Sequence, residues 1–273
     1  MAPKIAFIGG GNMARCLIGG LIARGAAPAA IAASEPQDAL REALARDFGI
    51  RTATGNAAIA ADADVVVLAV KPQVMRAVCL ELAPALAGRG ASVVSIAAGV
   101  RLAQFGRWLG PAQAVVRAMP NTPALLGCGI SGVVANAAAG AAARAAAEAV
   151  LAPAGPVVWI PDESLMDAVT AVSGSGPAYF FLLMEAMQAA AERQGLPREV
   201  AAALVRQTAL GAARMACEGA ETPSRLRERV TSPGGTTQAA LEAFEAGAFR
   251  GLVDAAIDRA TTRGRELSDL IGD

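Results

Sequence analysis

Three consecutive glycines directly after a short apolar segment constrain the fold of this chain more than any other feature. Residues 4–8 are strand-like, and the glycines at positions 9–11 follow at once. From residue 13 to residue 23, apolar side chains recur at helical spacing, and Gly25 ends that segment. A strand, a glycine turn and a helix in this order are the setting of the G-x-G-x-x-G/A fingerprint. The sequence therefore predicts a fold that binds a dinucleotide at its first turn.

Residues in this turn have separate physical roles. Gly9 permits a tight turn, and Gly11 lets the backbone approach a pyrophosphate. Ala14 allows the helix to lie close to the strand. The N-terminus of the helix then offers unpaired N–H groups and a partial positive charge to the phosphates.

A second predicted strand, residues 30–33, ends at Ser34 and Glu35, where such folds place the adenosine ribose. Glu35 lies near the spacing of about 20 residues at which an acid binds the ribose hydroxyls in NAD-dependent proteins. Ser34 is a possible donor to a 2′-phosphate instead, and the next arginine is Arg41. The choice between NADH and NADPH stays open at this point. The alternative for Glu35 is a solvated loop charge.

Further strands are predicted at residues 65–70, 92–96, 114–118, 130–134 and 157–160, with helical segments between several of them. The run at 65–70 is continuously apolar, which is typical of a strand buried on both faces of a parallel sheet. Ala97, Ala98 and Gly99 follow the next strand and leave room for a flat nicotinamide ring, although an ordinary tight turn explains them equally well. The alternation predicts a doubly wound α/β sheet of the Rossmann type.

The composition changes at Pro161, after which helical periodicity replaces the β-branched runs. We therefore expect a dinucleotide-binding domain at residues 1–160 and an all-α domain at residues 161–273. Within the latter, a helix is predicted to break at the Ser/Gly cluster of residues 173–176, and Pro177 to begin the next helix. The segments 225–230 and 249–270 have wide apolar faces, which indicates a dimer interface.

Residues 231–238 read Thr-Ser-Pro-Gly-Gly-Thr-Thr-Gln just before a helical segment. Two glycines and two threonines at a helix start expose N–H donors and hydroxyls, an arrangement that suits a carboxylate. The alternative is a capped helix N-terminus that binds nothing.

Charge and cysteine content exclude several classes of protein. Lys+Arg and Asp+Glu both total 24, so no basic surface favours nucleic acid. No segment reaches the roughly 18 apolar residues of a membrane span, and the N-terminus lacks signal-peptide features, so a cytoplasmic location is expected.

The cysteines Cys16, Cys79, Cys128 and Cys217 form no C-x-x-C pair and are expected to be buried, reduced thiols rather than disulfides or metal ligands.

The chain contains no histidine, which excludes Ser-His-Asp hydrolysis, histidine metal sites and histidine acid–base catalysis. Only Lys4 and Lys71 represent lysine, and no lysine follows the single tyrosine, Tyr179. A Tyr-x-x-x-Lys proton relay is therefore impossible. The chemistry must proceed with few proton donors, and no metal site is predicted.

Several segments together resemble the pyrroline-5-carboxylate reductase family. They occur in the order found in that family and span nearly the whole chain: Gly9-x-Gly11-Asn12-Met13, Ala69-Val70-Lys71-Pro72-Gln73, Arg117-Ala118-Met119-Pro120-Asn121-Thr122-Pro123, Ser173-Gly174-Ser175-Gly176-Pro177-Ala178-Tyr179 and Thr231-Ser232-Pro233-Gly234-Gly235-Thr236-Thr237. The resemblance implies an oxidoreductase in which NADPH or NADH reduces 1-pyrroline-5-carboxylate to L-proline, the last step of proline biosynthesis. It also implies homodimers through interleaved C-terminal helices, which often assemble into rings such as homodecamers.

The resemblance and the turns described above give two sets of site residues. The predicted cofactor contacts are Ile8, Gly9, Gly11, Asn12, Met13, Ser34, Glu35, Asn56, Ala69, Val70, Lys71, Pro72, Ala97, Ala98, Gly99, Met119 and Asn121. The predicted substrate contacts are Ser175, Gly176, Ser232, Gly234, Gly235, Thr236 and Thr237. Among them Thr237 is implied to be catalytic, with its hydroxyl at the ring nitrogen. The presence of Glu35 after Ser34 departs from the pattern expected for NADPH.

Two rival interpretations remain. A hydroxyacid dehydrogenase of the same two-domain plan uses a lysine in its helical domain, and no lysine follows Lys71. A non-catalytic regulator that binds NAD(P) needs no pocket for a second ligand, whereas the loop at residues 231–238 predicts one. Both features favour the reductase.

Overall fold

A computed structural model describes residues 2–271 and divides into two compact units. The described parts of Met1–Ser175 and Arg259–Asp273 form one, here called the sheet unit, and Gly176–Asp258 forms the other, the helical unit. The predicted boundary between residues 160 and 161 concerns functional domains and stays a prediction.

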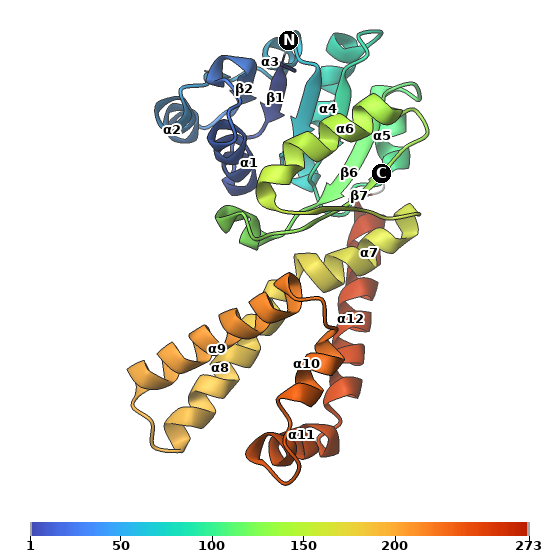
Figure 1. Ribbon diagram of the computed structural model, residues 1–273. Helices are drawn as coiled ribbons and strands as arrows, with labels where there is room; N and C mark the ends of the chain where they lie inside the picture. Colours follow the sequence, from blue (N-terminus) through green and yellow to red (C-terminus); the bar gives the residue numbers. More distant parts are fainter. Residues whose placement is uncertain (1, 272–273) are drawn as a thin grey trace. The chain divides into compact units, whose positions relative to one another are not determined.

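The sheet unit contains one eight-stranded sheet with the order β3-β2-β1-β4-β5-β6-β7-β8. Figure 1 labels β1, β2, β6 and β7 in this sheet. Its strands are β1 (Ile5–Ile8), β2 (Ile31–Ser34), β3 (Arg51–Ala53), β4 (Val65–Leu68), β5 (Ser92–Ser95), β6 (Val115–Met119), β7 (Ser131–Ala135) and β8 (Val157–Trp159). The strands from β3 to β6 are parallel, β7 is antiparallel to β6, and β8 is parallel to β7. The predicted Rossmann-like fold class is confirmed.

Helices cover both faces of this sheet, because alternate strand residues point to opposite sides. Phe7 and Val67 belong to a core with α1, α2 and α6, whereas Ile8 and Leu68 belong to a second core with α3, α4 and α5. The helices of the sheet unit are α1 (Asn12–Ala23), α2 (Asp38–Phe48), α3 (Asn56–Ala60), α4 (Pro72–Leu86), α5 (Leu102–Leu109), α6 (Ala141–Leu151) and α7 (Met166–Val169), with short 3₁₀ turns η1 (Pro28–Ala30), η2 (Thr122–Leu126), η3 (Ala152–Ala154) and η4 (Glu163–Leu165).

The strands differ from the predictions mainly at their ends. Ser34 is the last residue of β2 rather than the residue after it, and Ala69 and Val70 lie in the turn after β4. The strand β3 was not predicted, because Arg51–Ala53 contains no apolar run and lies at the edge of the sheet. The antiparallel direction of β7 was not predicted either.

The predicted break at the Ser/Gly cluster is present but short, because Ser175 alone lies between two helical elements and belongs to neither. The backbone stays helical through a π-helical turn at Thr170–Gly174, where the N–H of Ser175 donates to the carbonyl of Thr170 at 2.8 Å. The next helix, α8 (Gly176–Arg193), follows Ser175 and carries Pro177 at its second residue. A π turn absorbs one extra residue without ending a helix, and such turns are frequent at functional sites.

The helical unit contains α8, α9 (Arg198–Glu218), α10 (Pro223–Arg229) and α11 (Thr236–Ala246). The helices α8 and α9 lie side by side as an antiparallel pair (Figure 1). The last helix, α12 (Phe249–Leu270), begins in the helical unit and continues into the sheet unit.

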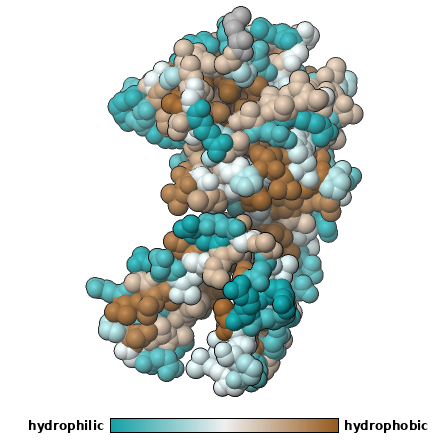
Figure 2. All heavy atoms as spheres, viewed as in Figure 1, coloured by the Kyte–Doolittle hydropathy of each residue, from teal (hydrophilic) through white to brown (hydrophobic). Residues whose placement is uncertain are grey.

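Large apolar side chains are exposed on these helices, among them Phe180, Phe181 and Leu182 on α8 and Leu252 on α12. Figure 2 shows hydrophobic residues at the surface of the helices of this unit. Within residues 2–271, no helix is both long and apolar enough to cross a lipid bilayer.

Candidate active site

The glycine turn after β1 has the geometry that its sequence predicts. Gly9 has φ +101°, and a Cβ atom there would lie 2.8 Å from the carbonyl oxygen of Ala69, so only glycine fits. Gly11 is the opposite case, because a Cβ atom there would have no neighbour within 4 Å. Gly11 is also the N-cap of α1 and makes no side-chain cap bond. The first N–H groups of α1 therefore face an open cradle that fits a pyrophosphate.

Glu35, the residue after β2, supports this turn. Its carboxylate accepts the N–H of Gly10 at 2.9 Å and the N–H of Gln37 at 3.0 Å. The residue is only 6% exposed, so the alternative of a solvated loop charge is wrong. Both carboxylate oxygens are already bonded within the protein, and a contact between Glu35 and ribose hydroxyls stays a prediction.

A chain of hydrogen bonds runs from Ser34 through Asn56 to Glu81. The hydroxyl of Ser34 donates to Asn56 Oδ1 at 2.7 Å, and Asn56 Nδ2 donates to Glu81 Oε2 at 2.7 Å. Ser34 is buried, whereas Asn56 is partly exposed. Asn56 is therefore the more accessible group beside the end of β2. Glu81 was not predicted, because it lies on α4, far from Ser34 in the sequence.

The guanidinium of Arg41, the first arginine after β2, folds back onto the end of the strand. It donates to the carbonyl oxygen of Glu35 at 3.0 Å and to Asp38 at 2.6 Å. Near the predicted ribose position the structure thus places three carboxylates (Glu35, Asp38 and Glu81) and one guanidinium.

The turns after β4 and β5 lie at the same edge of the sheet as the glycine turn. The N–H of Ala69 donates to the carbonyl of Ile8 at 2.8 Å, and Lys71 is the exposed N-cap of α4, with Pro72 at the first helical position. The N–H of Ala97 donates to Ser95 Oγ at 3.4 Å. Ligands of open α/β sheets bind at this edge, where strand order reverses between β1 and β4. The structure therefore brings most of the predicted cofactor contacts together: Ile8, Gly9, Gly11, Asn12, Met13, Ser34, Glu35, Asn56, Ala69, Val70, Lys71, Pro72, Ala97, Ala98 and Gly99.

Met119 and Asn121 pack against the π turn. Asn121 Nδ2 donates to the carbonyl of Ser173 at 3.1 Å, and its Oδ1 accepts the N–H of Ile130 at 3.0 Å. A Cβ atom on Gly174 would lie 2.5 Å from Met119 Cε. Asn121 thus uses both ends of its amide within the protein, which holds the turn beside Ser175. The assignment of Met119 and Asn121 as cofactor contacts stays a prediction.

The predicted substrate loop lies in the helical unit. Gly234 has φ +69°, and its N–H donates to Gln238 Oε1 at 2.7 Å. Gly235 is the N-cap of α11, which begins at Thr236 and Thr237, and no side chain caps this terminus. The N–H groups of its first turn therefore lack a side-chain acceptor, as a carboxylate site requires. Ser232 and Thr236 are exposed and Thr237 is partly exposed.

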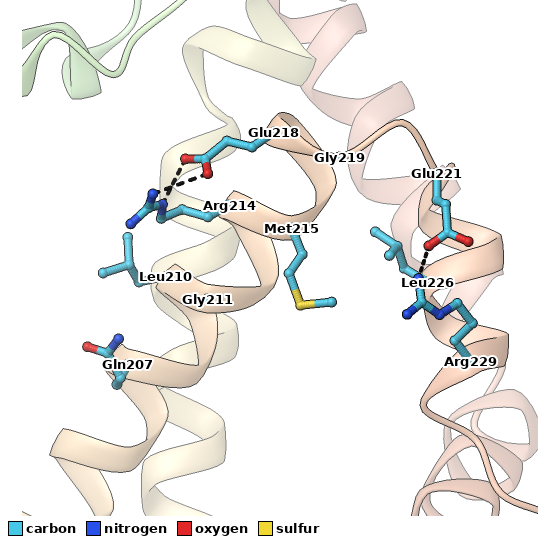
Figure 3. Close-up of a pocket in the computed structure, with 10 residues that line it drawn as sticks. All are labelled: Gln207, Leu210, Gly211, Arg214, Met215, Glu218, Gly219, Glu221, Leu226 and Arg229. Carbon is cyan, nitrogen blue, oxygen red and sulfur yellow. Dashed lines mark hydrogen bonds and ion pairs between the residues drawn. The ribbon is translucent and has the colours of Figure 1, made fainter.

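A groove of about 520 Å³ lies between α9 and α10 (Figure 3). Arg214 and Glu218 form an ion pair at 2.7 Å on α9, and Arg229 pairs with Glu221 across the groove from them. Leu210, Met215 and Leu226 are among its apolar lining. None of the predicted substrate contacts lines this groove.

One buried ion pair in the sheet unit was not predicted. Arg117 on β6 is nearly fully buried and pairs with Glu163 at 2.8 Å, and Glu163 also accepts the N–H of Leu102 at 2.8 Å. The pair connects β6, η4 and the start of α5. A charged residue inside an apolar strand is the one local sign of it in the sequence.

All four cysteines are free thiols. Cys79 is buried, as expected, and burial raises its pKa to about 12, which keeps the thiol protonated and unreactive. Burial also raises the pKa of the Cys16 thiol. The expectation of burial is wrong for Cys128 and Cys217, which are exposed. Within the described chain, His, Cys, Asp and Glu form no cluster that could hold a metal ion.

The fold and the glycine turn define a class of protein, the dinucleotide-dependent oxidoreductases with a Rossmann-like sheet. Consistent with this class, residues 4–99 match a family described as NADP oxidoreductase, coenzyme F420-dependent. Residues 163–267 match a second family model, described as pyrroline-5-carboxylate reductase dimerisation.

Relatives that match the chain from end to end identify the family. The pyrroline-5-carboxylate reductase of Pseudomonas aeruginosa is 54% identical, over 99% of this chain and 98% of its own length. The enzyme of that name from Vibrio alginolyticus is 46% identical over 98% of both chains. A solved pyrroline-5-carboxylate reductase from Coxiella burnetii superposes with a TM-score of 0.95 at 43% identity, over 98% of this chain and 99% of its own. The corresponding Plasmodium falciparum structure with NADP bound gives 0.85 at 26% identity, over 98% of both chains. The chain belongs to the pyrroline-5-carboxylate reductase family.

Proposed function

We propose that this protein reduces 1-pyrroline-5-carboxylate to L-proline at the expense of NADPH or NADH. The observation that carries the proposal is the end-to-end match to relatives of that name, one of which is 54% identical. The open cradle at Gly11 supports it independently, because it fits the pyrophosphate of such a cofactor.

The cofactor supplies the hydride, and the residues of the sheet unit bind and orient it. The N–H groups at the start of α1 hold the pyrophosphate, and Asn56 faces the adenosine ribose. The turns at Ala69–Pro72 and Ala97–Gly99 flank the nicotinamide, because they follow β4 and β5 on the far side of the point where strand order reverses.

The N-terminus of α11 binds the substrate carboxylate through the N–H groups that no side chain caps. Thr237, in the first turn of this helix, places its hydroxyl at the ring nitrogen. Ser175 and Gly176, directly after the π turn, complete the predicted substrate contacts.

The reaction is compatible with a chain that has no histidine. A protonated cyclic imine already carries its proton and an electrophilic carbon. Hydride delivery to that carbon gives an amine directly, and no alkoxide has to be protonated. The residues must therefore orient two ligands and bind a carboxylate, rather than supply a strong acid.

The protein is a homo-oligomer in this proposal, built from dimers that associate through the C-terminal helices. The match of residues 163–267 to a dimerisation family and the exposed apolar side chains of α8 and α12 support this assembly. In functional terms, residues 1–160 bind the cofactor and residues 161–273 bind substrate and the second subunit. Assembly of dimers into a ring and a cytoplasmic location stay predictions from the sequence.

Steady-state oxidation of NADPH and of NADH in the presence of 1-pyrroline-5-carboxylate tests the proposal. The loss of absorbance of the reduced nicotinamide measures the rate. We expect imine-dependent turnover with at least one cofactor, and the ratio of the two kcat/KM values gives the preference. Folded protein that binds NADPH or NADH but turns over no imine would favour the non-catalytic regulator instead.

A further inference from the structure

The last turn of α12 packs against the loop that follows β5. Both segments belong to the sheet unit. Arg101 and Asp269 form an ion pair at 2.6 Å, and Gln104 Nε2 donates to the carbonyl of Ile271 at 2.8 Å. Gln104 also accepts the N–H of Arg101 at 2.6 Å and is only 2% exposed. One buried amide therefore connects the start of α5 to the end of α12.

The same turn of α12 closes over Gly99. Gly99 has φ +79°, and a Cβ atom there would lie 2.9 Å from Ile271 Cδ1 and 3.7 Å from Ser268 Oγ. Ile271 packs into the hydrophobic core that contains Val100 and Phe105. Ser268 is buried, and among the described residues its hydroxyl has no hydrogen-bond partner. Ile271 and Ser268 thus pack closely on Gly99. The Arg101–Asp269 ion pair and the hydrogen bond from Gln104 to Ile271 form the rim of this contact.

The loop that α12 holds is the one expected beside the reacting ring. It follows β5, which neighbours β4 on the side of the sheet beyond the point where strand order reverses. A dinucleotide that crosses this point places its pyrophosphate at α1 and its nicotinamide toward β4 and β5. Loops of small residues are among the least stable parts of a fold unless other elements hold them.

We propose that the last turn of α12, together with the next residue Ile271, is a positioning element for hydride transfer. Asp269 and Ile271 of this element and Arg101, which pairs with Asp269, are the positioning residues. The element fixes the loop Ala97–Arg101 in the shape that holds the nicotinamide in its reactive orientation. The inference rests on the proposed function, since it assumes that this loop flanks the nicotinamide. The pyrophosphate and adenosine are held elsewhere, by α1 and the end of β2. Loosening the loop should therefore reduce the rate of hydride transfer more than cofactor affinity.

Charge reversal at the rim tests this proposal with little risk to the fold. Arg101→Asp places a carboxylate opposite that of Asp269, yet it puts an aspartate at the N-cap of α5, where that residue is favoured. We expect kcat to fall about fivefold in this variant, while the cofactor Kd changes less than about twofold and the melting temperature is retained. Asp269→Arg should behave likewise, and the double variant R101D/D269R should recover most of the lost kcat.

The deuterium isotope effect on kcat separates positioning from simple loss of active protein. Reduced cofactor deuterated at the transferred position of C4 should give a larger isotope effect in R101D than in wild type, because hydride transfer becomes the slower step. A smaller fraction of active protein lowers the rates with protiated and with deuterated cofactor equally, and therefore leaves the isotope effect unchanged. Arg263→Glu is the matched control, because it breaks a similar exposed ion pair with Glu266 on the same helix and does not touch the loop.

Ile271→Ala provides a second variant that removes the packing on Gly99 and leaves the rim charges intact. Wild-type kcat and isotope effect in both R101D and I271A would overturn the inference. If the wild-type protein turns over no imine, the proposed function fails instead. Hydrogen–deuterium exchange of the backbone amides of residues 98–100, measured in the cofactor complex, then tests whether the last turn of α12 holds the loop. This exchange should be faster in R101D and I271A than in R263E.

Discussion

Alanine substitutions at three glycines that flank α1 distinguish the effects of backbone strain, of steric contact and of ligand binding. Gly9 combines a positive φ with a backbone oxygen 2.8 Å from the position that a Cβ atom would take. Gly25, after the end of α1, has φ +95° but open space around the same position. Gly11 has φ −67° and open space. Each variant adds the same methyl group, so differences among them report the local geometry.

The expected changes in the free energy of unfolding follow directly. Gly25→Ala should lose about 1–2 kcal/mol, which is the cost of the left-handed conformation alone. Gly9→Ala should lose about 2 kcal/mol more, because the carbonyl of Ala69 is backbone and cannot move aside easily. Gly11→Ala should stay within about 0.5 kcal/mol of wild type or be slightly more stable, because the unfolded chain loses freedom.

Cofactor affinity should follow a different order. A methyl group on Gly11 fills the cradle at the start of α1, and the loss of about 1.4 kcal/mol of binding free energy would raise the Kd about tenfold. Gly25 is at the opposite end of α1, and its variant should bind normally. Urea denaturation followed by circular dichroism and titration by cofactor fluorescence measure the two quantities. Wild-type affinity in Gly11→Ala would refute the close-approach argument, and equal destabilisation of Gly9→Ala and Gly25→Ala would refute the steric one.

Three further predictions concern other parts of the chain. Thr237→Val should lower kcat at unchanged melting temperature, and unchanged steady-state kinetics would contradict its assigned role. Glu163→Gln should destabilise the protein by about 2–3 kcal/mol in urea denaturation, because it leaves the buried Arg117 without a countercharge; Glu266→Gln is an exposed control. The raised pKa of Cys79 means that its thiol ionises more readily in the unfolded chain than in the folded protein, so stability should fall as the pH rises from about 9 toward 12. The variant Cys79→Ala should show a weaker dependence, because the raised pKa of the Cys16 thiol still contributes to it, and an identical pH profile in both proteins would exclude the Cys79 thiol as a source.

The sequence was sufficient to predict elements whose residues are buried on both sides. The apolar run at β4 and the glycine turn after β1 have local patterns with one physical solution, and both were located correctly. The edge strand β3 has no such pattern, because Arg51 is exposed and its neighbours are only partly buried. The direction of β7 was missed, although residues 120–130 are too short to contain the usual helical crossover between parallel strands.

Within the site, short-range chemistry was predictable and long-range bonds were not. Gly9 and Gly11 could be assigned from their places in one turn. The Arg117–Glu163 pair and the bond from Asn56 to Glu81 join segments far apart in the sequence, and no local pattern says which residues pair. The Ser/Gly cluster was predicted as a break between two helices, whereas the π turn that ends just before Ser175 was not predicted.

The burial of Glu35 has a consequence for the redesign of cofactor preference. An acidic residue after the second strand of a dinucleotide-binding fold is the usual first position to mutate when a change between NADH and NADPH is wanted. In this protein its carboxylate also bonds the N–H groups of Gly10 and Gln37. Its removal leaves two amides unpaired, at about 1–3 kcal/mol for each that stays buried, and loosens the phosphate turn itself. A change of preference is more accessible at Asn56, whose side chain borders the same region and bonds Ser34 and Glu81 rather than the glycine turn.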